Sequence, residues 1–453
     1  MTMISYAVTD PATGQRLTEY SAATDAEIAD AIESAHRAYT GWGRTTELAE
    51  RAGFARRAAQ LFTEDKDELA QIIHREMGKP LEQSVAEVEF SADIITTFAE
   101  RAEEWLADEP LTVADGLRTF VRTQPLGVIL GIMPWNYPYY QVARFAIPNL
   151  ILGNTVILKH AEQCPESSAV IARIFHEAGF PEDAFINLYA SHEQISTIIA
   201  DPRVQGVSLT GSERAGSIVG AQAGQHLKRC VLELGGSDPF LVLDTADVDF
   251  AVEQAVGMRL ENTGQACNGT KRIIVMDKHY DEFAEKFTAA IREASYENGD
   301  FGPLSSEQAT RRLTEQVEAA VREGAELVVG NNEPEGNVYT PGVLTGITPD
   351  MEVASQELFG PVAQLYRVSS DDEAIEIANG VPYGLGSIII CDDRERAERV
   401  GDQLECGMVF IGSAELEGPD VPFGGVKRSG FGREMGRLGM ESFANKKIYR
   451  FAG

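Results

Sequence analysis

The chain up to about residue 107 carries apolar positions at the spacing of amphipathic helices. In TDAEIADAIESAHRAYTGW the apolar residues recur every three or four positions, which places them on one helix face. This predicted face consists of Ile28, Ala31, Ile32, Ala35 and Tyr39. Thr24 and Glu27 have the spacing of a capping box, so the first helix is expected to begin directly after Thr24.

The middle of the chain alternates short apolar runs with helical patterns. The runs are rich in β-branched residues and span 127–132, 154–160, 184–190, 206–211 and 229–234. Helical patterns follow over 165–179, 192–200 and 213–224. Nearly continuous apolar strands that alternate with helices predict a parallel sheet covered on both faces. Ligands of such sheets bind beyond the carboxyl ends of the strands.

A second alternation of strands and helices begins after Gly235 and Gly236. Its apolar runs are PFLVLD, KRIIVMD, FGPVAQLYRV, LGSIIICDD and GMVFIG. A glycine pair followed by proline favours a hinge, so the boundary between the two units is expected near residue 235. The length of 453 residues also exceeds what one ordinary core needs, which favours two or more domains.

Charge and cysteine content narrow the possible partners. Asp and Glu total 70 against 39 Lys and Arg, and the net charge of −31 argues against nucleic acid and anionic membranes as partners. The N-terminus resembles no signal peptide, and no apolar run approaches the ~18 residues of a membrane span. Five cysteines without a CxxC motif indicate reduced thiols in a cytoplasmic protein, with neither a disulfide framework nor a metal site.

One cysteine differs from the others in its surroundings. Cys267 lies in LENTGQACNGT, a polar stretch in which Gly264 and Gly269 allow close approach of a substrate. Cys164, Cys230, Cys391 and Cys406 are expected to be small apolar residues of the interior. From the local sequence alone, Cys267 is either another such residue or a nucleophile.

Three further positions have both structural and chemical interpretations. Glu233 ends an apolar strand, where it either pairs with a cation or serves as a general base with a raised pKa. Asn136 in MPWNYP is a turn residue or an amide donor to an oxyanion. Gly211 and Ser212 in TGSERAG follow a strand and open a helix, which suits a phosphate, although this is no GxGxxG fingerprint.

Taken together, these segments resemble the aldehyde dehydrogenase superfamily over nearly the whole chain. The motifs, in the order of that family, are PWNYP, LKHAEQCP, LTGSERAG, LELGGSDP, NTGQAC, ELFGPV and PFGGVKRSG. LELGGSDPF and PFGGVKRSG are most similar to the shorter bacterial succinate-semialdehyde dehydrogenases. The resemblance implies an NAD(P)-dependent oxidoreductase that converts a small carboxylated aldehyde, succinate semialdehyde, to succinate.

The resemblance also implies the catalytic roles. Cys267 would attack the aldehyde carbon, and the hemithioacetal formed would yield a thioester by hydride loss. Asn136 and the backbone N–H of Cys267 would stabilise the oxyanion. Glu233, 34 residues before Cys267, would activate the water that hydrolyses the thioester.

For the cofactor, the family pattern implies a larger set of residues. These are Trp135, Lys159, Glu162, Gly211, Ser212, Glu357 and Phe359. Lys159 and Glu162 would hold the adenosine ribose. Because a carboxylate at Glu162 would repel a 2′-phosphate, NAD is favoured over NADP, although Lys159 and His160 leave NADP open.

For the substrate, the resemblance implies that Arg144 binds the distal carboxylate, with Tyr137 and Tyr140 lining the tunnel. A surface or interdomain arginine is the alternative. Two departures weaken the case for succinate semialdehyde: Glu261 stands where related enzymes often carry arginine, and Gly412 stands where many carry asparagine.

The expected fold is α/β and aldehyde dehydrogenase-like, with three parts. Residues 1–111 and 126–235 would form a Rossmann-like cofactor domain, and residues 236–427 an α/β catalytic domain. Residues 112–125 and 436–453 would form a small oligomerisation arm that makes a homodimer or homotetramer. Two other functions stay open, namely a CoA-acylating or broad-specificity aldehyde dehydrogenase and a non-enzymatic oligomeric binding protein of this fold.

Overall fold

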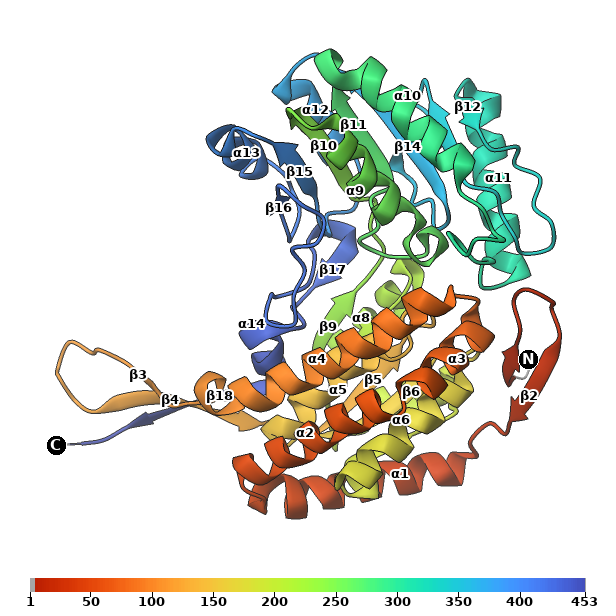
Figure 1. Ribbon diagram of the computed structural model, residues 1–453. Coiled ribbons are helices and arrows are strands. Elements are labelled where there is room, and N and C mark those ends of the chain that lie inside the picture. Colours follow the sequence, from red (N-terminus) through yellow and green to blue (C-terminus); the bar gives the residue numbers. More distant parts are fainter. Residues whose placement is uncertain (1–4, 453) are drawn as a thin grey trace.

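The computed structural model describes residues 5–452, and its N-terminal part is a hairpin followed by helices (Figure 1). The hairpin pairs β1 (Tyr6–Thr9) with β2 (Arg16–Tyr20). The helices are α1 (Asp25–Ala38), α2 (Leu48–Glu64), α3 (Lys66–Met77) and α4 (Leu81–Trp105). The predicted capping box is confirmed, because Thr24 and Glu27 exchange backbone-to-side-chain hydrogen bonds of 2.7 and 3.3 Å.

A six-stranded sheet follows, in the order β17-β9-β8-β5-β6-β7. Its strands are β5 (Val128–Met133), β6 (Thr155–His160), β7 (Phe185–Asn187), β8 (Val204–Thr210), β9 (Arg229–Glu233) and β17 (Gly430–Phe431). The connecting helices are α5 (Tyr140–Leu152), α6 (Pro165–Ala178), α7 (His192–Ala200) and α8 (Glu213–Gln225). All pairings are parallel except that of β17 with β9.

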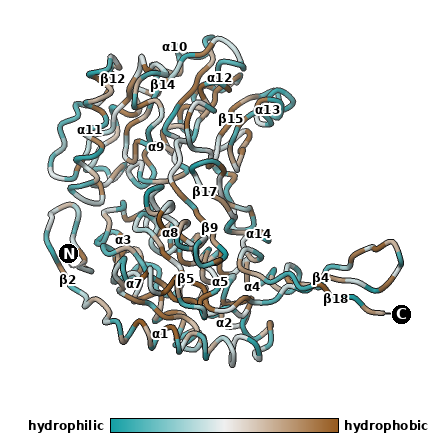
Figure 2. Tube along the Cα trace, turned by 180° about the vertical axis from the view of Figure 1, so that it is seen from behind, coloured by the Kyte–Doolittle hydropathy of each residue, from teal (hydrophilic) through white to brown (hydrophobic). Residues whose placement is uncertain are grey.

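Both faces of this sheet are buried, as the apolar runs predicted. Val128 and Leu130 of β5 enter the core that contains α1 and α7, whereas Ile129 between them enters the larger core with α4 and α5. The trace coloured by hydropathy shows apolar segments gathered along β5 and α5 (Figure 2). The sheet is therefore held from both sides, and its carboxyl edge has a fixed position.

The second sheet has seven strands in the order β12-β13-β14-β11-β10-β15-β16. They are β10 (Pro239–Asp244), β11 (Arg272–Met276), β12 (Glu326–Val329), β13 (Gly342–Thr345), β14 (Val362–Val368), β15 (Ile388–Cys391) and β16 (Phe410–Ile411). The accompanying helices are α9 (Val248–Leu260), α10 (Asp277–Glu293), α11 (Glu307–Glu323), α12 (Asp371–Asn379) and α13 (Arg394–Gly401). Only β12 and β13 pair antiparallel.

A third, small sheet protrudes from the body of the molecule (Figure 1). It pairs β18 (Ala444–Arg450), which follows α14 (Gly436–Glu441), with β4 (Thr119–Pro125), and β4 with β3 (Glu109–Pro110). Ile448 on β18 is 67% exposed, so this edge strand presents apolar surface and unpaired backbone groups. Among residues 5–452, no helix is long and apolar enough to cross a membrane. The proposed domain limits stay a prediction.

Candidate active site

Two cavities meet at Cys267. Cys267 lines both a tunnel of about 340 Å³ and a cleft of about 190 Å³. The tunnel is lined by Phe90, Tyr137, Tyr140, Glu261, Glu417 and Phe423, among others. The cleft is lined by Trp135, Asn136, Ser212, Glu233, Glu357 and Phe359, among others. A thiol at this junction is accessible to two different ligands at once.

The backbone before Cys267 adopts an unusual conformation. Asn262 and Thr263 have φ values of 48° and 58°, in the left-handed region that non-glycine residues seldom adopt. The Asn262 amide compensates by donating to the carbonyls of Asn136 (2.8 Å) and Gln265 (3.2 Å). Arg259 donates to the Gly264 carbonyl at 2.8 Å. These bonds hold the segment in one shape and thereby set the direction of the cysteine.

Lys271 holds the segment from the other side of Cys267. This lysine is fully buried, and its Nζ donates to the carbonyls of Ala266 and Cys267, each at 2.6 Å. The same Nζ lies 3.5 Å from the Glu357 carboxylate. Sequence analysis missed this residue, although a lysine four positions after a nucleophile candidate was a possible signal.

The environment of the Cys267 sulfur favours the neutral thiol. Burial raises the pKa of the Cys267 thiol to about 12, although the positive charges of Arg144 and Lys271 act in the opposite direction. The thiolate is the nucleophilic form, so attack requires that the proton leave during the reaction.

Asn136 lies where its amide can serve the same centre. It follows the end of β5, is 5% exposed, and its Nδ2 donates to the Gln265 carbonyl at 3.0 Å. Because Gln265 belongs to the segment before Cys267, this bond joins the end of the first sheet to the nucleophile segment. The second N–H of the amide stays available to a ligand oxygen.

Glu233 is a buried carboxyl group without a hydrogen-bond partner. It ends β9, is 2% exposed, and neither of its side-chain oxygens has a partner among the described residues. Burial raises its pKa well above the ordinary value, against the positive charges of Arg144 and Arg433. A buried carboxyl group without a partner lowers the stability of the folded protein. Such groups are typical of functional positions. Glu233 and Cys267 line the same cleft.

Aromatic rings and a carboxylate shape the rest of the cleft. The rings of Trp135 and Phe359 pack edge to face with centroids 5.8 Å apart. Glu357 accepts a hydrogen bond of 3.0 Å from the backbone N–H of Gly236. A Cβ atom at Gly235 would lie only 2.4 Å from a Glu357 oxygen, so a larger residue there would force the carboxylate to shift. The structure thus brings these predicted cofactor residues together.

The other predicted cofactor residues lie at two strand ends of the first sheet. The Gly211 N–H donates to the Glu233 carbonyl, and Ser212 caps α8, its hydroxyl accepting from the Ala215 N–H at 3.3 Å. Lys159 is the next-to-last residue of β6, and its Nζ lies 2.6 Å from the Glu162 carboxylate.

Of the three predicted substrate residues, two line the tunnel and one lies behind its wall. The hydroxyls of Tyr137 and Tyr140 face the tunnel carboxylates. Arg144 is fully buried, its Nε lies 2.5 Å from Glu434, and its Nη1 donates to the Tyr140 hydroxyl at 2.9 Å. Arg144 therefore reaches the tunnel through two side chains that line it, since its guanidinium lies 4.7 Å from the ring centroid of Tyr140 and 4.4 Å from that of Phe423.

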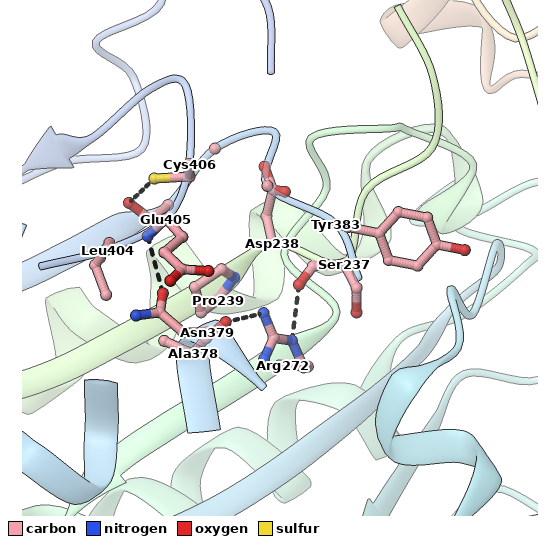
Figure 3. A pocket seen from close by; sticks show the side chains of 13 residues that line it. Ser237, Asp238, Pro239, Arg272, Ala378, Asn379, Tyr383, Leu404, Glu405 and Cys406 are labelled. Atoms are coloured by element: carbon pink, nitrogen blue, oxygen red, sulfur yellow. Dashed lines mark hydrogen bonds between the residues drawn. The ribbon is translucent and has the colours of Figure 1, made fainter. Parts of the chain in front are cut away.

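A smaller pocket lies apart from this centre, in the second sheet (Figure 3). Its volume is about 10 Å³, which is room for about one water molecule. Arg272 donates to the Ser237 carbonyl at 2.7 Å, and the Cys406 thiol donates to the Met408 carbonyl at 3.1 Å. Cys406 is half-buried rather than interior, and a structural role for it stays a prediction. No cluster of metal-binding side chains occurs in the described part of the chain.

Comparison with known proteins gives consistent results. A model of the aldehyde dehydrogenase family matches residues 2–449. A Deinococcus radiodurans protein named succinate-semialdehyde dehydrogenase [NADP(+)] is 48% identical, over 98% of this chain and 94% of that protein. A Mycobacterium avium protein of the same name is 42% identical, over 97% and 95%. The crystal structure of a Streptococcus pyogenes succinic semialdehyde dehydrogenase with NADP+ is 40% identical, covers 99% of this chain and 100% of that one, and superposes with a TM-score of 0.95.

These comparisons show that the preference for NAD was wrong. The two relatives are named as NADP(+) enzymes, and the solved structure contains NADP+. The error lay in treating the Glu162 carboxylate as free to repel a 2′-phosphate. Instead, it pairs with Lys159 at 2.6 Å and lies 3.6 Å from His192, so two basic groups surround it.

Proposed function

The chain belongs to the aldehyde dehydrogenase family, and we propose that it oxidises succinate semialdehyde to succinate with NADP. The position of Cys267 at the junction of a tunnel and a cleft carries this proposal. The names of the relatives, at 42–48% identity over almost the whole chain, support the choice of substrate and cofactor.

The residues of the cleft fit a dinucleotide. Ser212 at the start of α8 offers helix N–H groups to a pyrophosphate, and Glu357 offers a carboxylate to a ribose. Lys159 supplies positive charge for a 2′-phosphate once the Glu162 carboxylate turns aside. A nicotinamide held there would supply the acceptor for the hydride that leaves the aldehyde carbon.

Cys267 begins the reaction in this proposal. Its sulfur forms a bond to the aldehyde carbon, and the proton of the thiol leaves to solvent or to a neighbouring base. The negative charge that develops on the aldehyde oxygen is stabilised by the Asn136 amide and the backbone N–H of Cys267. Removing one such donor typically lowers the rate by about 10²–10³. Loss of hydride from the hemithioacetal leaves a thioester on Cys267.

Glu233 completes the reaction by accepting a proton from water. The hydroxide equivalent adds to the thioester carbon, the carbon–sulfur bond breaks, and succinate leaves. The raised pKa of Glu233 makes its ionised carboxylate a stronger base than an ordinary glutamate. The presence of this base also argues against a CoA-acylating enzyme, because activated water would hydrolyse the thioester before CoA could take the acyl group.

The tyrosine hydroxyls would bind the distal carboxylate of the substrate. Tyr137 and Tyr140 now donate to Glu261 and Glu417, at 2.6 and 3.4 Å. A substrate carboxylate would replace these acceptors, and Arg144 would strengthen the Tyr140 hydroxyl as a donor.

The test is steady-state oxidation of succinate semialdehyde with NADP, followed by absorbance of the reduced cofactor. We expect turnover in the native protein and none in Cys267→Ala, which should still bind NADP. Turnover by Cys267→Ala would remove the proposed nucleophile. The same assay with and without CoA separates hydrolysis from acyl transfer. If no aldehyde were oxidised, the remaining hypothesis would be a non-enzymatic binding protein of this fold.

We further propose that the protein is a cytoplasmic homodimer or homotetramer in which the arm contacts another subunit. The apolar, 67% exposed Ile448 on the edge strand β18 supports this role. Sedimentation of the native protein against Ile448→Glu tests it, and equal masses would contradict it.

A further inference from the structure

A large polar pocket lies at the base of the arm, where β4 and β18 leave the body of the molecule (Figure 1). The volume of this arm-base pocket is about 710 Å³, and none of its lining residues lines the tunnel or the cleft. One wall is the connection between α1 and α2, which includes the π-helical turn Tyr39–Gly43. The other wall consists of the two arm strands. The proposed oxidation uses no part of this pocket.

Positive charge gathers around the arm-base pocket, although the whole protein has a net charge of −31. The cationic side chains that line it are Arg44, Arg51, Arg122 and Lys447. Of these, only Arg122 forms an ion pair with another described residue, Asp108, at 2.6 Å. The second carboxylate that lines the pocket belongs to Glu47. Three cations are therefore opposed by this single free carboxylate.

Arg51 is the buried member of this set. It is 8% exposed, and its Nε donates to the Ile151 carbonyl at 2.7 Å. Its two other nitrogens donate to the carbonyls of Thr46 and Leu152. A guanidinium group has five N–H donors, so two of them stay free after these three bonds. Carbonyl oxygens satisfy N–H groups without neutralising the charge, and a ligand anion would supply the missing partner.

The arm turns one defined face toward the pocket. Lys447 on β18 pairs directly opposite Arg122 on β4, and Asn445 pairs opposite Gln124. Residues paired in this way lie on the same face of a sheet, whereas the next residue along a strand lies on the other face. Ile448, which we propose to contact another subunit, therefore lies on the opposite face of the arm. Assembly through Ile448 does not require the face that lines the pocket.

The start of α2 adds to the positive character of the other wall. This helix begins at Leu48, which lines the pocket, and its N-cap residue Glu47 forms no side-chain cap. The free N–H groups and the dipole of a helix start both favour an anion. The helix start and the cations of the pocket therefore attract the same kind of ligand.

We propose that the arm-base pocket binds a phosphorylated sugar or polyol that carries at least two negative charges. Its phosphate oxygens would accept hydrogen bonds from Arg44, Arg51 and Lys447. Its hydroxyl groups would contact the hydroxyl and amide side chains of the lining, which are Thr45, Thr46, Gln124 and Asn445. Tyr39 is the only aromatic residue among the described lining residues, which disfavours a nucleobase as the main contact.

The test is calorimetric titration of the protein in an excess of NADP, which keeps phosphate groups out of the cleft. The probes are fructose 1,6-bisphosphate, inorganic phosphate and fructose. We expect the bisphosphate to bind more tightly than inorganic phosphate and fructose not to bind. Arg44→Gln and Lys447→Gln should each weaken binding of the bisphosphate about tenfold, on the scale of one hydrogen bond to a charged group. Both side chains are exposed, so these variants are expected to fold.

Two further variants separate the pocket from the general charge of the molecule. Lys446→Gln removes the same charge from the next position on β18, on the opposite face of the arm, so it should leave the affinity unchanged. Glu47→Gln removes the free carboxylate and should raise the affinity about threefold, on the scale of one exposed charge.

The measurement needs no turnover, so its result does not depend on the proposed oxidation. Binding of fructose or inorganic phosphate as tight as that of the bisphosphate would overturn the proposal. An affinity that falls equally in Lys446→Gln and Lys447→Gln would overturn it too, because the anion would then respond only to the total charge.

Discussion

Replacement of Glu233 by glutamine separates the two halves of the proposed reaction. The side chain is 2% exposed and its oxygens have no partner, so glutamine of the same shape fits without breaking a hydrogen bond. It cannot accept a proton from water. Acylation of Cys267 should continue, whereas release of the acid should become slow.

The expected size of the effect follows from the loss of a general base. Such bases contribute about 10²–10⁴ in rate, which corresponds to about 3–5 kcal/mol of barrier at about 1.4 kcal/mol per factor of ten. Rapid mixing of Glu233→Gln with succinate semialdehyde and NADP should therefore give a burst of about one reduced cofactor per active site, followed by a slow steady rate. In the native enzyme, the steady rate should rise with pH through the raised pKa of Glu233, since only the ionised carboxylate accepts the proton.

Glu76→Gln provides the matched control. Glu76 is also fully buried, and burial raises its pKa to about 8, but it holds the start of α6 through Ser167 rather than lining the cleft. This variant should show no burst. The reasoning about Glu233 would be refuted if Glu233→Gln turned over at the native rate, or if it lost the burst together with the steady rate.

Three further substitutions test the surroundings of the cysteine and the cofactor. Lys271→Met leaves two buried carbonyls without a donor, which costs about 1–3 kcal/mol of stability for each. We therefore expect kcat to fall at least about tenfold and the melting temperature to drop. Native values in both measurements would contradict the positioning role of Lys271. Glu162→Ser frees Lys159 for a 2′-phosphate, so the ratio of kcat/KM for NADP over NAD should rise; a fall in this ratio would argue against that pairing. Gly235→Ala places a Cβ atom 2.4 Å from a Glu357 oxygen, so KM for NADP should rise about tenfold, and an unaltered KM would show that Glu357 does not contact the cofactor.

Most of the fold could be predicted from the sequence because its strands are buried on both faces. Such strands are continuous apolar runs, as in Val128–Met133, and their pattern does not depend on distant contacts. The end of the first helix was less certain. Tyr39 fits the apolar face, but the helix ends at Ala38 and Tyr39 begins a π-helical turn, in which the helical spacing no longer applies.

Side chains that act through distant partners could not be placed from the sequence. Arg144 lies on a helix that is buried on all sides, and its partner Glu434 is far along the chain, so nothing local indicates that the guanidinium lies behind Tyr140. Glu417 likewise reaches the tunnel from a loop with no recognisable motif. The cofactor preference failed for the same reason, because the pairing of Glu162 with Lys159 depends on geometry.

The most direct test of the account is mass spectrometry of the peptide that contains Cys267. Glu233→Gln is mixed with succinate semialdehyde and NADP, quenched in acid during the slow phase, and digested. The account predicts that one succinyl group is attached to Cys267. Formation of reduced cofactor with Cys267 unmodified, or with the succinyl group on another residue, would contradict it.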